Sequence, residues 1–248
     1  MRNLFTTALV THVASGFIAL VAAPVAMMVK KGGKHHRLWG KIFFWCMSFV
    51  AISAFLMSVL HSNPFLFMIS GFSFYTITSG YRWIYRKNVK SVKDVKLVDW
   101  IFIVTAALFN ISLFVYGCYS IFNSPDNPFS YIATVFGLLG IWFVIKNAKQ
   151  YFKPPEKKYA WLLNHMGGMV GGYIATVSAF SAVNFNFLPT IIQWLWPSII
   201  GVPLLLLWIN SYRRKFEKGK SLAELVELRE NKTSSQNLKV KNHDTNEK

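Results

Sequence analysis

Long apolar runs alternate with short polar segments along most of the chain. A helix needs about 20 mostly apolar residues to cross a hydrocarbon core of about 30 Å. Seven runs in this chain are close to that length. They span residues 4–28, 42–60, 65–85, 100–122, 129–145, 161–183 and 191–209. Because lipid offers the backbone no hydrogen-bond partner, each run is predicted to be a transmembrane helix. The first run exceeds the apolar core of a signal peptide, about 7–15 residues, and is expected to be retained as a span.

Lys and Arg residues mark every second connection between these runs. They gather after the first, third, fifth and seventh runs, whereas segments 61–64, 123–128 and 184–190 contain none. Because basic residues remain on the cytoplasmic side of a membrane, the N-terminus is predicted outside and the C-terminus in the cytoplasm. An odd number of helices satisfies every connection. We therefore predict an all-α fold, an integral membrane helical bundle with seven transmembrane helices.

Composition favours lipid rather than water as the surroundings of this chain. Of the 248 residues, 53% are hydrophobic and 15% are charged, whereas soluble domains carry about 25% charged residues. The net charge is +17. The basic residues lie between apolar runs, which argues against nucleic acid and favours anionic lipid at the inner leaflet as a partner. Cys46 and Cys118 both lie within apolar runs, which excludes a disulfide framework and a zinc–cysteine motif.

The polarity of the chain changes after the last run. We divide the chain into a transmembrane domain, residues 1–210, and a basic, amphipathic cytoplasmic tail, residues 211–248. Ser221 and Glu224 have the spacing of a capping box, which predicts a short amphipathic helix from Ser221 to Leu228. From about residue 231 the tail is polar and lacks aromatic residues, which predicts disorder.

Histidines within the apolar runs carry the candidate chemistry. His12 lies about two turns inside the first run, where an ionisable side chain is costly and indicates either a functional site or a neutral ring bonded to a neighbouring helix. His165 begins the sixth run and shares a helix face with Gly168 and Gly172. Such a glycine stripe permits close packing of another helix or of a planar ring.

Topology brings several polar residues to one predicted face of the membrane. Near the inner face lie His36, Arg37, Arg82, Asp99, Asn164 and His165. Arginine binds carboxylate and phosphate groups bidentately, so these residues form the candidate binding site for an anionic ligand. Arg82 and Asp99 are also placed to form an ion pair. The sequence does not decide whether His35 or His36 faces the bundle.

Other features limit the function classes. Acidic residues are nearly absent from the runs, which disfavours an ion-coupled transporter. A Gly-rich phosphate loop and a Ser-His-Asp arrangement are absent from the sequence, so no enzyme class follows from it. Aromatic residues at the inner ends of the runs are predicted to be interface anchors rather than a ligand cage: Trp39, Trp83, Tyr85, Trp100, Tyr159 and Trp161.

Three short motifs suggest a family. They are His12-x-x-x-Gly16, then Gly33-Lys34-x-His36-Arg37-x-x-Gly40, and His165-Met166 at the start of a run that continues Tyr173-Ile174-Ala175-Thr176. In these motifs the chain, from residue 8 to about 210, resembles an uncharacterised family of bacterial multi-pass membrane proteins grouped under a domain of unknown function. The resemblance implies a membrane location and no established activity. We expect that membrane to be the bacterial cytoplasmic (inner) membrane.

Histidines near helix ends, with glycines beside them, give a looser resemblance to di-haem membrane cytochromes of the b type. That resemblance implies transmembrane histidines that ligate haem iron from facing helices. The candidate ligands here are His12, His36 and His165, and of these only His36 and His165 lie at matching predicted depth.

Three functions therefore remain open from the sequence. The first is binding of an anionic ligand, a lipid headgroup or a small solute at the inner His/Arg cluster. The second is a redox protein that holds b-type haem through histidine ligands. The third is a non-catalytic scaffold or assembly partner, either a homo-oligomer or bound to a membrane partner protein, that docks through the tail helix.

Overall fold

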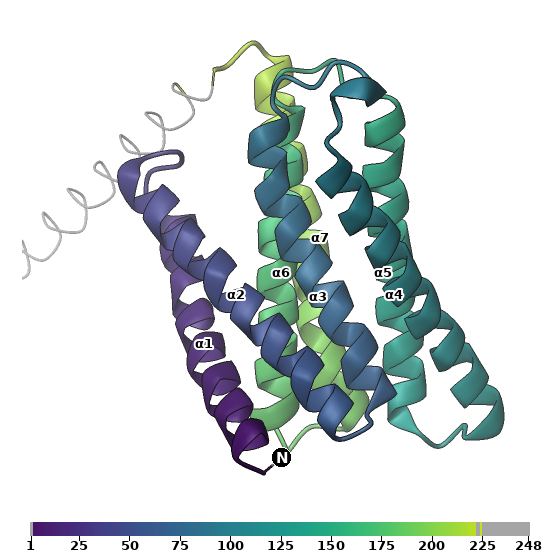
Figure 1. The fold of residues 1–248 in the computed structure, drawn as a ribbon. Helices are drawn as coiled ribbons and strands as arrows, with labels where there is room; N and C mark the ends of the chain where they lie inside the picture. Colours follow the sequence, from purple (N-terminus) through teal and green to yellow (C-terminus); the bar gives the residue numbers. More distant parts are fainter. Residues whose placement is uncertain (1, 222–223, 225–248) are drawn as a thin grey trace, which may run out of the picture.

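The computed structural model describes residues 2–221 and Glu224, and these residues fold into long helices (Figure 1). The order is α1 (Arg2–Met28), α2 (Lys34–Leu60), α3 (Pro64–Arg82), α4 (Leu97–Asn123), α5 (Pro128–Phe152), α6 (Ala160–Asn184) and α7 (Thr190–Glu217), with the short 3-10 helices η1 (Trp83–Arg86) and η2 (Val92–Asp94) between α3 and α4. No strand occurs in these residues. The all-α prediction is confirmed for this part of the chain.

The predicted tail helix and the predicted disorder after residue 231 lie outside the described residues, apart from the start of the helix. There, the backbone N–H of Ser221 donates to Glu224 Oε2 at 3.0 Å, and the backbone N–H of Glu224 donates to Ser221 Oγ at 3.2 Å. These are the two reciprocal hydrogen bonds of a capping box.

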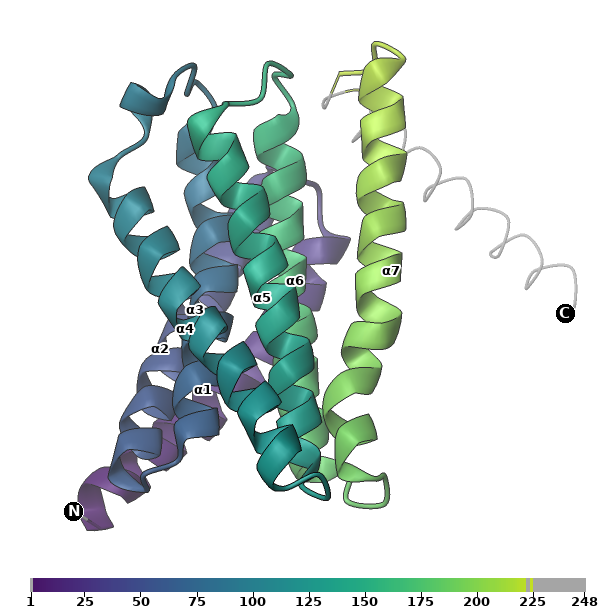
Figure 2. The same cartoon turned by 90° about the vertical axis from the view of Figure 1, so that its right-hand side faces the viewer.

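Consecutive helices pack as antiparallel pairs. The largest contacts join α1 to α2, α4 to α5, and α6 to α7. In Figure 1, α3 and α6 lie between the α1–α2 pair and the α4–α5 pair. Figure 2 shows α7 at one edge of the bundle, against α6. The start of α1 and the end of α7 lie at opposite ends of the bundle (Figure 1).

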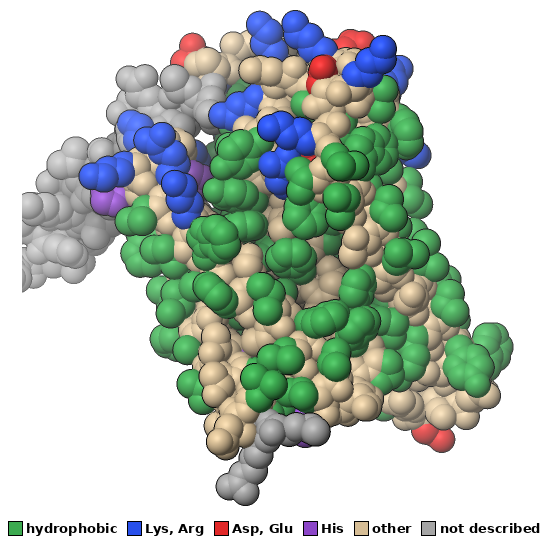
Figure 3. All heavy atoms as spheres, in the orientation of Figure 1, with side chains coloured by type: hydrophobic (Ala, Val, Ile, Leu, Met, Phe, Trp, Pro, Cys, Tyr) green, Lys and Arg blue, Asp and Glu red, His purple; other side chains and the backbone are tan. Residues whose placement is uncertain are grey.

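Six of the long helices, all except α3, are long and apolar enough to cross a membrane. Large apolar side chains cover the outer surface of the bundle between its two ends (Figure 3). A soluble monomer rarely exposes contiguous apolar patches beyond a few hundred Å². The chain is therefore a multi-pass membrane protein.

The helix α3 is the central helix, and this position explains its mixed composition. It contacts α2, α4, α5 and α6. Its segment Tyr75–Gly80 is buried at every position, including Thr76, Thr78 and Ser79. Hydroxyl groups at helix–helix contacts are tolerated because they bond within protein rather than facing lipid. For example, Thr76 Oγ1 donates to the carbonyl of Phe72 at 2.8 Å.

Lys and Arg side chains gather at the end of the bundle where α1, α3, α5 and α7 finish, which we call the basic end (Figure 3). Three helices extend into it beyond the predicted runs. The helix α2 begins at Lys34 instead of residue 42, α5 continues to Phe152, and α7 passes the expected domain boundary at residue 210 and ends at Glu217. The apolar run shows only which part of a helix lies in the hydrocarbon core. The helix itself continues through the headgroup layer, because its backbone hydrogen bonds are made within the helix.

Close contact between α3 and α6 gives a first prediction. A Cβ atom at Gly168 would lie 2.4 Å from the Cα of Gly80, so Gly168→Ala should force the helices apart and cost about 1–3 kcal/mol of unfolding free energy. The matched control is Gly167→Ala, whose Cβ would meet only Ile209 Cδ1 at 3.7 Å. Thermal unfolding in detergent should show a lower midpoint for Gly168→Ala alone, and equal midpoints would contradict this packing.

Candidate functional site

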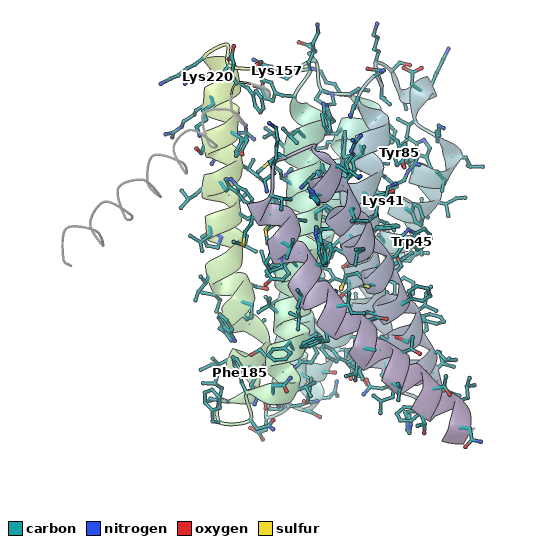
Figure 4. All side chains as sticks on the ribbon, turned by 90° about the vertical axis from the view of Figure 1, so that its left-hand side faces the viewer. Lys41, Trp45, Tyr85, Lys157, Phe185 and Lys220 are labelled. Atoms are coloured by element: carbon teal, nitrogen blue, oxygen red, sulfur yellow. The ribbon has the colours of Figure 1, made fainter. Side chains whose placement is uncertain are left out.

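A cavity of about 420 Å³ opens at the basic end, between α1, α2, α3, η1, α6 and α7. Its walls are mostly apolar and include these aromatic side chains: Phe43, Tyr81, Tyr85, Trp161, Tyr173, Trp208 and Tyr212. Its charged lining residues are all basic: Lys31, Arg37, Lys41 and Lys87. Figure 4 shows Lys41 and Tyr85 toward this end and Phe185 at the opposite end. A cavity with aromatic walls and basic residues around it suits a ligand with an apolar body and negative groups.

Two histidines line this cavity from different helices. His36 comes from the first turn of α2 and His165 from the second turn of α6. The centres of their rings lie 6.3 Å apart, and the ring planes are inclined by 81°. Both side chains are half-buried.

Each ring is held by a backbone carbonyl. Nδ1 of His36 lies 2.9 Å from the carbonyl oxygen of Ala26, and Nδ1 of His165 lies 2.9 Å from that of Gly80. A carbonyl oxygen only accepts, so Nδ1 carries the hydrogen in both rings, and the neutral ring keeps a lone pair on Nε2. No hydrogen bond from the described part of the chain reaches either Nε2. This is the arrangement of metal-ligating histidines, whose other ring nitrogen donates to a carbonyl or carboxylate.

Glycines keep space free beside these rings. Gly40, one turn after His36, lines the cavity, and a Cβ atom there would meet nothing within 4 Å. Gly32 has φ +74° in the connection between α1 and α2, a conformation that few other residues adopt. That turn brings the connection back against the end of α1, where Lys31 Nζ donates to the carbonyl of Ala26 at 3.1 Å.

The predicted inner cluster divides into separate groups. His36, Arg37 and His165 line the cavity together, whereas His35 is exposed and is not among its lining residues. Of the two neighbouring histidines, His36 therefore faces the bundle. Asn164 faces away from the cavity and exchanges hydrogen bonds with the amide of Gln150.

Arg82 and Asp99 form the predicted ion pair away from the cavity. Arg82 Nε donates to Asp99 Oδ1 at 2.8 Å, and Nη2 donates to Oδ2 at 3.0 Å. Asp99 is 1% exposed. Bidentate pairing uses both carboxylate oxygens and fixes the start of α4 against the end of α3.

His12 lies far from the cavity. Its Nδ1 is 3.1 Å from the carbonyl oxygen of Val50 and 3.1 Å from Ser53 Oγ on α2. Ala23, the nearest α1 residue of the cavity lining, is roughly 16 Å further along the helix. The outer histidine, His61, packs its ring against Phe5 with ring centres 4.3 Å apart. The contacts of His12 are those of a ring bonded to a neighbouring helix.

The glycine stripe of α6 packs against α3. Gly168 faces Gly80, and a Cβ atom at Gly172 would lie 2.3 Å from Ile77 Cγ2. The stripe thus serves helix packing, and it brings α6 close enough for His165 to reach the carbonyl of Gly80.

Two aromatic predictions need correction or refinement. Trp83 is not an interface anchor: it is 2% exposed, and its Nε1 donates to Asn147 Oδ1 at 3.0 Å. The contact with α5 removes it from the membrane surface. Tyr85 and Trp161, predicted as anchors rather than as part of a ligand cage, both line the cavity.

Arg86 belongs to the basic segment after the third apolar run, and sequence reasoning does not single it out. Arg86 is 5% exposed, and its guanidinium lies over the rings of Trp83 and Tyr151. A weak signal existed, because Trp83 precedes Arg86 by three residues and shares its helix face. Tyr151 comes from α5, which no local pattern connects to this segment.

The sequence model of a family described as "Predicted membrane protein (DUF2306)" matches residues 9–147. The chain belongs to this family. The match confirms the resemblance seen in the motifs of His12 and His36, whereas His165 lies beyond the matched residues. Membership of DUF2306 supports a membrane location and brings no activity with it. No curated protein and no solved structure matches the chain significantly.

The ligand side chains in this DUF2306 member limit which metal or cofactor the cavity could bind. Among the described residues, no group of three or more His, Cys, Asp or Glu side chains could hold a metal ion. Haem needs fewer protein ligands, because the macrocycle supplies four nitrogens and leaves only axial positions to fill.

Proposed function

We propose that the chain crosses the bacterial inner membrane seven times, with its N-terminus outside and the basic end in the cytoplasm. The distribution of Lys and Arg supports this orientation. The enclosure of α3 by other helices supports counting it as a span despite its lower hydropathy. Reporter fusions after Ser124 and after Lys158 should report opposite compartments, outside and cytoplasm respectively. The reverse assignment, or a shared compartment, would contradict the proposal.

We further propose that the cavity at the basic end holds a b-type haem, with His36 and His165 as the two axial ligands. The ring separation carries this proposal. A metal–imidazole bond is about 2 Å long and the ring centre lies about 1 Å further, so two imidazoles on opposite sides of one iron have centres roughly 6 Å apart. The two rings here are 6.3 Å apart, with both Nδ1 atoms already occupied by carbonyls.

The rest of the cavity suits the same ligand. The aromatic walls would contact the macrocycle, and Gly40 leaves open space beside His36. Arg37, Lys41 and Lys87 supply positive charge for two propionates. With His36 and His165 as its two protein ligands, a bound haem would supply one-electron transfer at the cytoplasmic side rather than binding or activation of a gas.

Absorption spectra of the purified full chain test this proposal. Protein from membranes supplied with haem should carry about one haem per chain, and its spectrum should change reversibly between the oxidised and the dithionite-reduced states. A colourless protein, obtained while a control cytochrome from the same cells is loaded, would contradict it.

A second candidate is binding of an amphipathic anion that contains no metal, such as a fatty acid. It is favoured by the basic lining around an aromatic cavity, without reference to the histidine pair. Trp161 and Trp208 line the cavity, so such a ligand should quench tryptophan fluorescence in a saturable way. Quenching of equal size in Arg37→Gln and wild type would argue against a role for the basic residues.

A further inference from the structure

Arg86 is a buried cation without a hydrogen-bond partner. It is 5% exposed, and its Nε, Nη1 and Nη2 atoms have no hydrogen bond in the described part of the chain. Its guanidinium carbon lies 4.2 Å from the ring centre of Trp83 and 3.7 Å from that of Tyr151. Contact with the two rings stabilises the cation, but its five N–H donors remain without hydrogen-bond acceptors in the described part of the chain.

No carboxylate in the described part of the chain pairs with Arg86, and Arg86 does not lose its own charge. The nearby carboxylate, Asp99, already accepts two hydrogen bonds from Arg82. Burial lowers the pKa of Arg86, while Tyr151 and Asp99 raise it. The ordinary pKa of a guanidinium is so high that the group stays protonated at neutral pH. A desolvated cation with free donors is costly unless an anion meets it.

A small cavity lies beside Arg86 and opens toward other cations. Its volume is about 10 Å³, close to the space that one water-sized atom needs. Its lining contains Arg86, Lys87, Lys157 and Lys158 but no Asp or Glu. Lys157 and Lys158 are exposed, in the connection between α5 and α6, and Figure 4 shows Lys157 at the extreme basic end.

We propose that this cavity is a binding site for a phosphate oxyanion. One phosphate oxygen enters the cavity and accepts hydrogen bonds from the edge of the Arg86 guanidinium. The remaining oxygens stay at the mouth, within reach of Lys157 and Lys158. The phosphate belongs either to an acidic lipid, since the site lies at the basic end, or to free inorganic phosphate. The site does not depend on the haem proposal, because neither His36 nor His165 lines it.

The experiment compares probes on the full chain in detergent. Phosphatidylglycerol, inorganic phosphate and diacylglycerol are titrated separately, and the rise of the thermal unfolding midpoint gives the affinity of each. Phosphatidylglycerol should raise the midpoint, and diacylglycerol, which lacks the phosphate, should not. In Arg86→Gln the affinity should fall by at least about tenfold, because charge-assisted hydrogen bonds are lost.

The control and a second variant keep the proposal testable. Lys93→Gln removes one exposed charge from the connection between α3 and α4 and should bind like wild type. If Arg86→Gln does not fold, the exposed pair Lys157→Gln/Lys158→Gln decides, with an expected loss of several-fold. A response to inorganic phosphate identifies the free ion as sufficient, and a response to phosphatidylglycerol alone identifies the lipid. Unchanged affinity in Arg86→Gln, or in the lysine pair, or equal effects of diacylglycerol and phosphatidylglycerol, would overturn the proposal.

Discussion

Replacing either His36 or His165 with alanine should abolish the Soret band of the purified protein. Each ring is proposed to supply one axial nitrogen, and its Nδ1 is already fixed by a backbone carbonyl. Loss of a hydrogen bond to a metal-ligating histidine costs about 10–100-fold in affinity, so loss of the ligand itself should cost more than about 100-fold. Haem content per chain, measured by extraction, is the direct readout.

The control for this prediction lies next to one of the ligands. His35→Ala removes an exposed imidazole that does not line the cavity, and it should leave haem content unchanged. His12→Ala should also retain haem, because His12 contacts Val50 and Ser53 far from the cavity. Loss of haem in His35→Ala, or full retention in His36→Ala, would contradict the assignment of the ligands.

Asp99→Asn should be the most destabilising single change at the basic end. Asp99 is 1% exposed and neutralises Arg82 through two hydrogen bonds, and Arg86 also lies within its electrostatic influence. Removing one partner of a buried pair costs about 3–5 kcal/mol. Because Arg82 is partly exposed, we expect about 3 kcal/mol, the lower end of this range. Thermal unfolding in detergent measures the effect.

A matched acidic residue provides the comparison. Asp126 is exposed in the connection between α4 and α5, and Asp126→Asn should change the unfolding free energy by less than about 0.5 kcal/mol. Equal stability of Asp99→Asn and Asp126→Asn would show that the Arg82 pair contributes nothing to the fold.

Depth in the membrane could be predicted from the sequence, but lateral position could not. Apolar runs and alternating basic segments placed His36 and His165 at the same end of the bundle, and the structure brings their rings together. The same reasoning placed Asn164 there, yet Asn164 faces Gln150. The glycine periodicity of α6 predicts a close contact at Gly168, but it does not identify Gly80 of α3 as the partner.

The site beside Arg86 shows a second reason for incomplete prediction. A run of basic residues after an apolar segment is typical of a solvated connection. The segment of Trp83 and Arg86 instead folds as a 3-10 helix that packs against Tyr151 and Asn147 of α5. Arg86 is buried by α5, a helix distant in sequence. Its residue type and its position in the chain alone therefore predict an exposed side chain.

The haem site is tested most directly by titration of hemin into the purified, haem-free full chain, followed by absorption and by electron paramagnetic resonance. The account predicts saturation at about one hemin per chain and a six-coordinate, low-spin iron bound by two imidazoles. The same titration of His36→Ala should give weak binding without that signal. Hemin that binds without saturation, or a low-spin signal that persists in either His36→Ala or His165→Ala, would contradict the account.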